Sequence, residues 1–442
     1  MRIALVAMSG VRACDSELME LGLTLPGFVE RSEVVASLPS LGLLTLAALT
    51  PARHDVEYIE IPDLATQESL PSGFDLVAIS SYSAQIGQAY ELARRCRDAG
   101  TPVVMGGPHV TALPDEASES CTAVVVGEGE PVWGEVLSDC ESGRMTGVYD
   151  ARRRHYDLAE SPVPAFDLLD ISNYNRLTVE TNRGCPHRCE FCGSSVILTN
   201  GYKQKPVGNV IREIEKIHEI WDHPFLEFAD DNAFVDKGYW KELLANLPGK
   251  RIRWFAETDL SVAEDGELLT LMRENGCAQV LIGFESPVEA GLEGIELRND
   301  WKRKRFPQYR EAIQTIQSHG ISVNGCFVLG LDGQTPEIFD EVFEFVRETE
   351  LFEVQITVLT PFPGTPLLER LEKEDRILEP KRWEMCTLFD VNFRPSHMTV
   401  SELASGFRGL GVKLYSEEFT NWRRSNFKKY LRTAESPHGG AG

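Results

Sequence analysis

Long apolar runs and positive charge are both scarce in this chain of 442 residues. A membrane-spanning helix needs about 20 consecutive apolar residues, whereas the apolar runs here, such as 124–126, are of strand length. The 44 Lys and Arg stand against 68 Asp and Glu, which gives a formal net charge of -24. Such a charge repels polyanions over a broad surface. We therefore expect no membrane span and no nucleic-acid partner.

The sequence also lacks a signal-peptide pattern. The apolar stretch within residues 1–10 runs into charged residues without a small-residue cleavage site, so we interpret it as a buried first strand. Of the ten cysteines, three crowd into eight residues and the others are scattered. That usage is typical of a metal site in a reducing compartment, not of a disulfide framework. We expect a cytoplasmic protein.

The composition is that of a globular protein with two or three domains, since 42% of the residues are hydrophobic and 25% are charged. Residues 1–145 alternate short apolar runs with helix-length amphipathic segments. Strand candidates are 3–7, 56–61, 76–80, 103–105 and 123–126, and helical spacing marks 41–49 and 84–99. This alternation predicts a doubly wound, Rossmann-like parallel sheet with helices on both faces. Its ligand should lie at the carboxyl ends of the strands, in the loops 80–83, 106–110 and 127–130.

The second half repeats the strand and helix rhythm. Residues 146–175, with a basic run and two prolines, are expected to be a linker. Within 176–395 the strand candidates are 177–181, 225–229, 252–256, 280–284, 322–329 and 354–359. Six such units predict a (β/α)6 partial TIM barrel with its chemistry at the carboxyl-terminal rim. Residues 396–442 predict a short helical C-terminal segment and a tail, so the fold class as a whole is α/β.

A cysteine motif, Cys185-x3-Cys189-x2-Cys192, directly follows the first strand of the second half. Three thiolates on one loop suit three irons of a 4Fe–4S cluster and leave the fourth iron without a protein ligand. The alternative is a structural zinc site, which needs four ligands. His187 is the candidate fourth ligand, but it lies inside the first cysteine spacing, and no second CxxC pair follows. We expect one cluster, because no further motif is formed by Cys277, Cys326 and Cys386.

At these residues the sequence resembles the radical S-adenosylmethionine (SAM) superfamily. In that family SAM chelates the open iron, and one electron from the reduced cluster cleaves SAM to methionine and a 5′-deoxyadenosyl radical. The resemblance implies an enzyme whose cofactor carries the difficult chemistry while the protein positions the substrate. It also implies a partner that donates electrons, such as flavodoxin or ferredoxin.

The resemblance runs through the barrel and implies a set of SAM contacts. Carboxylates end the second and third barrel strands, and Gly283-Phe-Glu285-Ser286 ends the fourth. The implied SAM-binding residues are Phe191, Gly193, Asp230, Asp231, Glu257, Gly283, Glu285, Ser286, Val328 and Pro361. Each carboxylate alone would also fit a solvated strand end, and their order on successive strands is what favours a site.

The glycine-bearing loops of the first half, with residues 39–46, resemble the cobalamin-binding-domain branch of this superfamily. A backbone without Cβ approaches a flat macrocycle or its nucleotide tail closely. The resemblance implies cobalamin contacts from Ser80, Ser81, Tyr82, Gly106, Gly107, His109, Val110, Gly127, Glu128 and Gly129. A dinucleotide site is a weaker interpretation, because the third glycine of that fingerprint is missing and the loop follows the last strand.

One feature of cobalamin-dependent mutases is absent. Their DxHxxG stretch supplies an imidazole to cobalt, but residues 9–22 contain no histidine, and the first in the chain is His54. The lower face of a bound cobalamin should therefore meet water or nothing from this loop, and some members of the branch act without cobalamin. His109 could face the corrin or could be satisfied by local hydrogen bonds. Cys14 is interpreted as a buried thiol.

Two segments carry weaker signals. The basic run 301–305 is interpreted as a solvated face that could also meet an anionic substrate. Substrate contacts are expected from the barrel mouth, the domain junction and residues 383–394, where Asp390, Asn392 and Arg394 could offer polar groups. The sequence does not identify the small-molecule substrate.

Together these expectations describe a cobalamin-dependent radical SAM enzyme that methylates an unactivated carbon. Because the same two domains serve several reactions, a ring-forming, rearranging or oxygen-inserting radical enzyme is the alternative. A corrinoid- or SAM-binding protein without radical chemistry is a third hypothesis.

Overall fold

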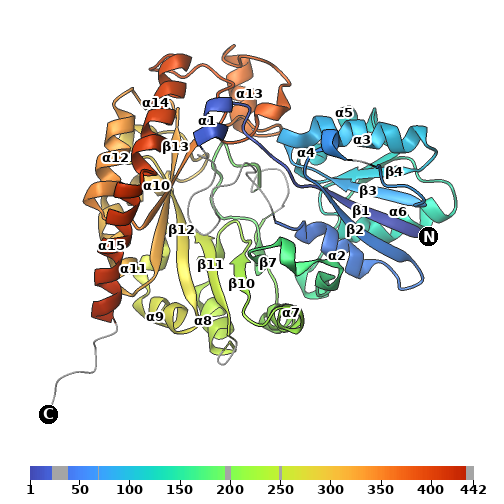
Figure 1. Cartoon of the computed structure of the whole chain (residues 1–442), viewed down its shortest axis with the longest axis horizontal. Helices are drawn as coiled ribbons and strands as arrows, with labels where there is room; N and C mark the ends of the chain where they lie inside the picture. Colours follow the sequence, from blue (N-terminus) through green and yellow to red (C-terminus); the bar gives the residue numbers. More distant parts are fainter. Residues whose placement is uncertain (22–37, 68, 195–200, 248–250, 435–442) are drawn as a thin grey trace.

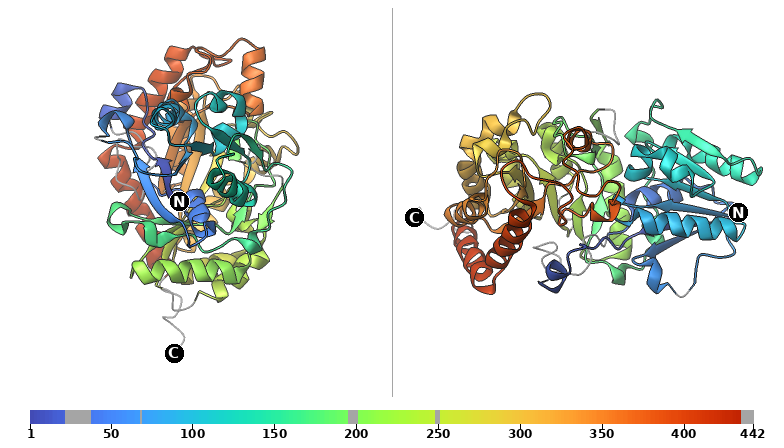
Figure 2. Two further views of the ribbon diagram at one scale, coloured as in Figure 1. Left: turned by 90° about the vertical axis from the view of Figure 1, so that its right-hand side faces the viewer. Right: turned by 90° about the horizontal axis from the view of Figure 1, so that it is seen from above.

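The computed structural model describes residues 1–21, 38–67, 69–194, 201–247 and 251–434. Two lobes lie side by side in Figure 1, the N-terminal sheet with its helices in blue and teal and a larger β/α lobe in green to red. The right-hand view of Figure 2 shows the same division from above. No helix among the described residues is long and apolar enough to cross a membrane.

The N-terminal lobe is built on six parallel strands in the order β2-β1-β3-β4-β5-β6. Their bounds are β1 (Arg2–Met8), β2 (Asp55–Ile61), β3 (Leu76–Ser80), β4 (Val103–Gly106), β5 (Ala123–Val126) and β6 (Gly147–Asp150). Side chains alternate between the two faces of a strand, so Ala4, Val6 and Met8 pack on one face of β1 and Ile3, Leu5 and Ala7 on the other.

Helices cover both faces of this sheet, as predicted. One core contains residues of α3 (Ile86–Asp98), α4 (Pro108–Ala112) and α5 (Pro114–Ser118). The opposite core contains residues of α2 (Leu41–Leu49) and α6 (Glu130–Glu141). The strand β6 lies in the segment interpreted as a linker. It is an edge strand in which only Tyr149 is buried, so its sequence has no apolar run that would reveal it.

The second lobe contains six parallel strands in the order β14-β13-β12-β11-β10-β7. They are β7 (Leu177–Val179), β10 (Phe225–Phe228), β11 (Arg253–Thr258), β12 (Cys277–Glu285), β13 (Ser322–Leu329) and β14 (Glu353–Val358). The barrel is open between the edge strands β7 and β14, which confirms the partial barrel. A short antiparallel pair of strands, β8 (Asn182–Arg183) and β9 (Lys203–Gln204), forms a separate two-stranded sheet.

Helices pack on the outside of the barrel. They are α7 (Val207–Ile220), α8 (Lys237–Ala245), α9 (Gly266–Glu274), α11 (Tyr309–Ser318), α12 (Ile338–Glu348) and α13 (Pro366–Lys373). The outward side chains of β12 and β13 meet this layer, since Phe284 stacks on Phe327 and both rings contact Phe345 of α12. The alternate side chains of the same strands therefore face the barrel interior.

The C-terminal segment is a pair of helices, α14 (Val400–Leu414) and α15 (Glu417–Ala434). A capping box between Thr399 and Glu402 begins α14. Arg423 of α15 is fully buried and pairs with Glu353 of β14 at 3.0 Å. Near the start of the chain, α1 (Ser16–Leu21) lies beside α14 (Figure 1), and Arg408 of α14 holds Asp15 at 3.0 Å. The N-terminal lobe is thus tied to the far side of the barrel.

Candidate functional site

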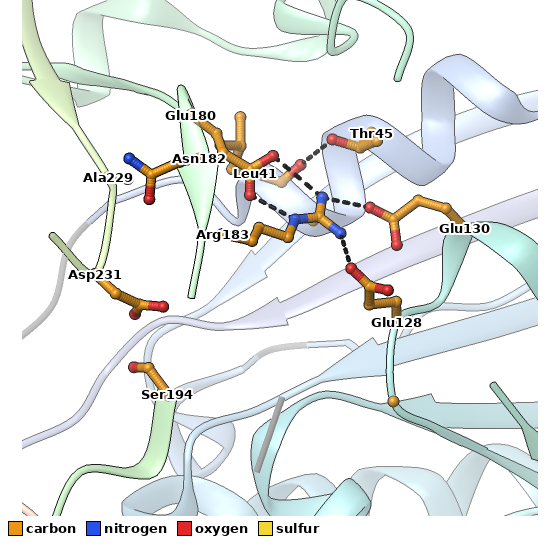
Figure 3. A pocket seen from close by; sticks show the side chains of 12 residues that line it. Leu41, Thr45, Glu128, Glu130, Glu180, Asn182, Arg183, Ser194, Ala229 and Asp231 are labelled. Carbon is orange, nitrogen blue, oxygen red and sulfur yellow. Dashed lines mark hydrogen bonds and ion pairs between the residues drawn. The ribbon is translucent and has the colours of Figure 1, made fainter. Parts of the chain in front are cut away.

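The carboxyl ends of the two sheets meet at the junction of the lobes. Arg183 of β8 donates to Glu128, in the loop after β5, at 3.0 Å and to Glu130, at the start of α6, at 2.6 Å. It also donates to Glu180 at 2.6 Å. Figure 3 shows the guanidinium at the centre of these three carboxylates, beside a pocket of about 280 Å³ that residues of both lobes line. The strand-end loops of the two lobes therefore line one pocket.

The cysteine loop begins where Gly184 takes the left-handed backbone, with φ at 87°. Cys189 is buried, Cys185 and Cys192 are half-buried, and Cys192 N–H donates to Cys189 O at 3.1 Å. Burial raises the pKa of Cys185 to about 11 and that of Cys189 to about 12. The charge of Cys192 adds to both shifts, and the charge of Cys185 adds to the shift of Cys189. A bound iron cluster would reverse these shifts, because metal ligation stabilises thiolates.

His187 is already engaged and does not complete a zinc site. Its Nε2 lies 3.1 Å from Asp259 Oδ2, and its ring lies 4.6 Å from the ring of Trp301. Burial opposes ionisation of Asp259, but hydrogen bonds from His187, Ser261 and Asn232 outweigh it and lower its pKa. In the described part of the chain, no three His, Cys, Asp or Glu side chains are grouped to hold a single ion. With His187 engaged by Asp259, the motif offers three thiol ligands, a set that suits a cluster with an open iron better than a four-coordinate zinc.

The paired aspartates after β10 play different parts. Asp230 is 2% exposed and accepts from Thr181 N at 2.7 Å, Asn182 N at 2.9 Å and Thr181 Oγ1 at 2.6 Å. Burial raises the pKa of Asp230 to about 7. Asp231 accepts from Gly184 N at 3.0 Å and lines the pocket of Figure 3. Asp230 thus fixes the backbone that leads into the cysteine loop. Asp231 is the aspartate that a ligand in the pocket would contact.

Glu285 ends β12 in a strained conformation. The register between β12 and β13 slips between Gly283 and Glu285, and Glu285 has φ at 61°, in the left-handed region. Bulges of this kind re-aim a side chain. Glu285 is 7% exposed and pairs with Lys302 of α10 (Trp301–Arg305). The interpretation of the whole basic run as a solvated face was therefore wrong for Lys302, whose side chain is only 12% exposed.

The remaining SAM candidates lie around the same rim. Ser286 is fully buried and accepts from Val288 N at 3.2 Å. Val328 is 8% exposed on β13, and Pro361 follows β14. Phe191 packs against the barrel core, and Gly193 follows the third cysteine. These assignments stay predictions.

The barrel interior contains one carboxyl group without a basic partner among the described residues. Glu227 of β10 pairs with Arg176 at 2.6 Å, whereas no described residue forms an ion pair with Glu257 of β11. Burial, with the charges of Glu227, Asp231 and Asp230 adding to it, raises the pKa of Glu257 to about 8. Burial and the charge of Glu257 also raise the pKa of Cys326 on β13.

A second cavity, of about 150 Å³, opens in the N-terminal lobe at the ends of β3, β4 and β5. Ser80, Gly106, Gly107, Gly127 and Gly129 line it, opposite Gly42 and Leu46 of α2. Gly107 has φ at 104°, and a Cβ there would lie 3.2 Å from Ser80 Oγ. The glycines predicted to admit a cofactor thus border an actual cavity.

Tyr82 lies in the loop that follows β3. Surrounding protein and the Glu227 carboxylate raise the pKa of Tyr82 although its side chain is 56% exposed. Ser81 next to it is 4% exposed and donates to Tyr82 O.

His109 and Val110 face the sheet core and do not line either pocket. His109 is fully buried, with Nδ1 3.0 Å from Ser83 Oγ and Nε2 3.3 Å from Glu116 Oε1. Of the two interpretations of His109, local hydrogen bonding is the one that its surroundings favour. Both residues belong to α4, which turns them toward α3 and α5.

The segment 383–394 does not present the polar groups expected of it. Asp390 accepts from the N–H groups of Cys14 and Asp15, at 2.9 Å each. Asn392 donates to Glu379 O at 3.0 Å, and Arg394 to Asp375 O at 2.8 Å. These three side chains hold loops together, so their expected part in substrate binding is a prediction that the contacts do not favour. Cys14 is exposed, contrary to its interpretation as a buried thiol.

Sequence reasoning assigned no role to Arg183, two residues before Cys185, to Glu130, the last residue of the predicted loop 127–130, or to Lys302 within the basic run. Arg183 pairs with residues 53 and 55 positions away along the chain, and Lys302 with a residue 17 positions away. Local spacing does not reveal such distant pairs.

Comparison with known proteins agrees with this architecture. A family model described as the radical SAM superfamily matches residues 179–346, and one described as a B12 binding domain matches residues 31–137. A domain of unknown function, DUF4070, matches residues 365–439. The two matches place a radical SAM type of domain after a B12-binding type of domain, the combination that the sequence predicted.

Two curated relatives extend over most of the chain. The bacteriochlorophyllide d C-12(1)-methyltransferase of Chlorobaculum tepidum is 28% identical over 385 residues, which are 85% of this chain and 82% of that protein. The hopanoid C-2 methylase of Rhodopseudomonas palustris is 28% identical over 78% of this chain and 66% of its own length. The solved structure of the radical SAM methyltransferase TsrM from Kitasatospora setae superposes with a TM-score of 0.65 and 16% identity, covering 98% of this chain and 99% of that one. The likeness to TsrM confirms the fold.

Proposed function

We propose that this protein is a cobalamin-dependent radical SAM methyltransferase that acts on a carbon of a small molecule. The observation that carries the proposal is that the cysteine loop and the glycine-lined cavity open toward the same junction, joined by Arg183 and its partners Glu128 and Glu130. Two curated relatives that match 85% and 78% of this chain are named as a methyltransferase and a methylase. A methyl carrier and a radical source would then face one substrate.

The residues present fit the three groups. Cys185, Cys189 and Cys192 would hold a 4Fe–4S cluster, and Asp231 and Glu285 would meet SAM beside it. The glycine-lined cavity would admit the nucleotide tail of cobalamin, with Tyr82 and Glu128 near the corrin. When bound, the cluster supplies the electron that cleaves SAM, and cobalamin supplies the methyl group.

The chain's own residues prepare this site. Asp230 fixes the backbone from which the cysteines project. Arg183 neutralises carboxylates that would otherwise repel one another across the junction. The open barrel interior, with Glu257 and Cys326 on its wall, is where the substrate would bind, enclosed by the N-terminal lobe. Enclosure matters because it keeps a reactive radical from water and other quenchers.

Further parts of the proposal concern the setting of the enzyme. A cytoplasmic location and an electron donor such as flavodoxin or ferredoxin follow from an oxygen-sensitive cluster that must be reduced. The proposed domain boundaries lie near residues 145, 175 and 395, and the first must move because β6, at Gly147–Asp150, belongs to the N-terminal sheet. Functional boundaries are better placed after residue 150.

The first experiment is anaerobic reconstitution followed by quantification of iron, sulfide, cobalamin and, after reduction with SAM present, deoxyadenosine. About four irons and one corrinoid per chain with deoxyadenosine formed would support the proposal. Four irons and deoxyadenosine without a corrinoid would refute cobalamin dependence and favour a ring-forming or rearranging radical enzyme. Failure to bind iron would refute both.

A steric variant tests the cavity separately from folding. A Cβ on Gly42 meets nothing within 4 Å, and Gly42 lines both pockets. Gly42→Leu should therefore fill the cavity mouth and weaken cobalamin binding at least about tenfold without loss of stability, since leucine favours helices over glycine by up to about 1 kcal/mol. The matched control is Gly134→Leu in α6, which also has free space but lines neither pocket. Equal cobalamin affinity in the two variants would remove this cavity from the proposal.

A further inference from the structure

The basic helix α10 contains one lysine that behaves differently from its neighbours. Arg303 pairs with Glu289 at 3.0 Å, Arg305 with Glu264, and Lys304 reaches Asn299 O at 2.6 Å, all at the surface. Lys302 instead points inward, with 12% of its side chain exposed. A buried ammonium group is costly unless it is paired and hydrogen-bonded, so its partners indicate what it is for.

Both partners of Lys302 belong to the bulge at the end of β12. Its Nζ donates to Gly283 O at 2.8 Å and to Glu285 Oε1. Burial alone would lower the pKa of Lys302, but the charges of Glu285 and Cys189 outweigh burial and raise it. The lysine therefore stays charged and holds the glutamate at one carboxylate oxygen.

The bulge is shaped to receive this lysine. A Cβ on Gly283 would lie 2.6 Å from Glu285 Oε1 and 3.0 Å from Lys302 Nζ. No larger residue fits at that position unless the ion pair moves. A residue such as Glu285, at positive φ, persists where surrounding contacts determine its conformation, and the lysine supplies two of those contacts.

The same helix is fastened to the cysteine loop. Trp301 N–H donates to the Glu296 carboxylate, and Glu296 forms a β-bridge with Cys189. The Trp301 ring contacts His187, inside the cysteine motif. Leu297 N–H donates to Arg188 O, and Glu190 N–H donates to Ile295 O, at 2.9 Å each. Lys302 is therefore fixed beside the loop that carries the three cysteines.

We propose that Lys302 is a positioning residue of the SAM and cluster site: it holds Glu285 in the bulge and places a buried positive charge next to Cys189. This inference rests on the proposed function and adds a residue to it. Reduction adds one negative charge to a cluster, so a nearby fixed cation favours the reduced state. Loss of the cation should make the cluster harder to reduce, and loss of the tether should free Glu285 and weaken SAM binding.

The test compares Lys302→Met with Lys302→Arg and with Lys304→Met, a surface control two residues away on the same helix. Each reconstituted protein is measured for iron content, for SAM affinity by equilibrium dialysis and for the midpoint potential of the cluster by redox titration. We expect Lys302→Met to retain iron, to bind SAM at least about tenfold more weakly and to have a more negative potential. Lys302→Arg should restore the potential, because it restores the charge, and Lys304→Met should match the wild type.

The outcomes separate this inference from the function on which it rests. An unchanged potential and an unchanged SAM affinity in Lys302→Met would overturn the role of Lys302 while leaving the radical SAM assignment intact. A fall in iron content that Lys302→Arg also shows would make Lys302 a structural residue only, which likewise overturns the inference. A wild-type protein that binds neither iron nor SAM would refute the proposed function itself.

Discussion

Replacing Arg183 by methionine should lower the free energy of unfolding by about 3–5 kcal/mol, the cost of leaving a buried charge without its partner. The guanidinium is 16% exposed, and its three carboxylate partners are 7–13% exposed. Methionine preserves much of the length of the arginine side chain and its apolar contacts, but it removes all the hydrogen bonds to the three carboxylates.

The size of the effect follows from what remains after the change. Glu128 keeps Lys203 at 2.5 Å, and Glu180 keeps Lys205 at 3.6 Å. Glu130, by contrast, has Arg183 as its single ion-pair partner among the described residues. The expected loss of unfolding free energy is therefore the cost of leaving one carboxylate without a cation, not three.

Urea unfolding followed by circular dichroism measures this loss from the midpoint at constant slope. Arg154→Met is the matched control, since Arg154 and Glu135 are 40% and 53% exposed, and an exposed pair contributes under about 1 kcal/mol. Glu130→Gln in the Arg183→Met background should recover part of the loss, because it removes the orphaned charge. A loss below about 1 kcal/mol for Arg183→Met, or a further loss from the second change, would refute the argument.

Two further predictions concern the cysteine loop and the barrel interior. Cys189→Ala should abolish SAM cleavage and reduce iron content, whereas Cys121→Ala, a buried thiol of the N-terminal lobe, should leave both unchanged; full iron content in Cys189→Ala would exclude the cluster. The pKa of Glu257 is about 8 in the folded protein and about 4.3 in the unfolded chain. The folded protein therefore binds this proton more tightly, and the contribution of Glu257 to stability falls as the pH rises from about 4 to about 8. Glu257→Gln should therefore gain urea resistance over the wild type between about pH 4 and 8, and a difference that does not vary with pH would contradict the assigned burial.

Much of the fold followed from local pattern. The alternation of apolar runs and amphipathic segments depends on residues two to four positions apart, and every predicted strand corresponds to an observed one. Two exceptions have a physical reason. The edge strand β6 buries a single side chain, so it has no apolar run, and the pair of β8 and β9 has only two residues in each strand.

The sequence by itself determined the chemistry that depends on close spacing. Three cysteines within eight residues necessarily share one loop, and glycines at strand ends necessarily leave backbone exposed. Neither feature depends on the rest of the chain. These features predicted the cluster loop and the glycine-lined cavity.

Only the tertiary structure decided which charged side chains are buried and what they face. Asp230 and Asp231 are adjacent in sequence, yet one supports a loop and the other lines a pocket. Lys302 and Lys304 belong to one basic run, yet one is buried against Glu285 and the other is at the surface. Burial and pairing depend on partners that are distant along the chain, so local spacing cannot specify them.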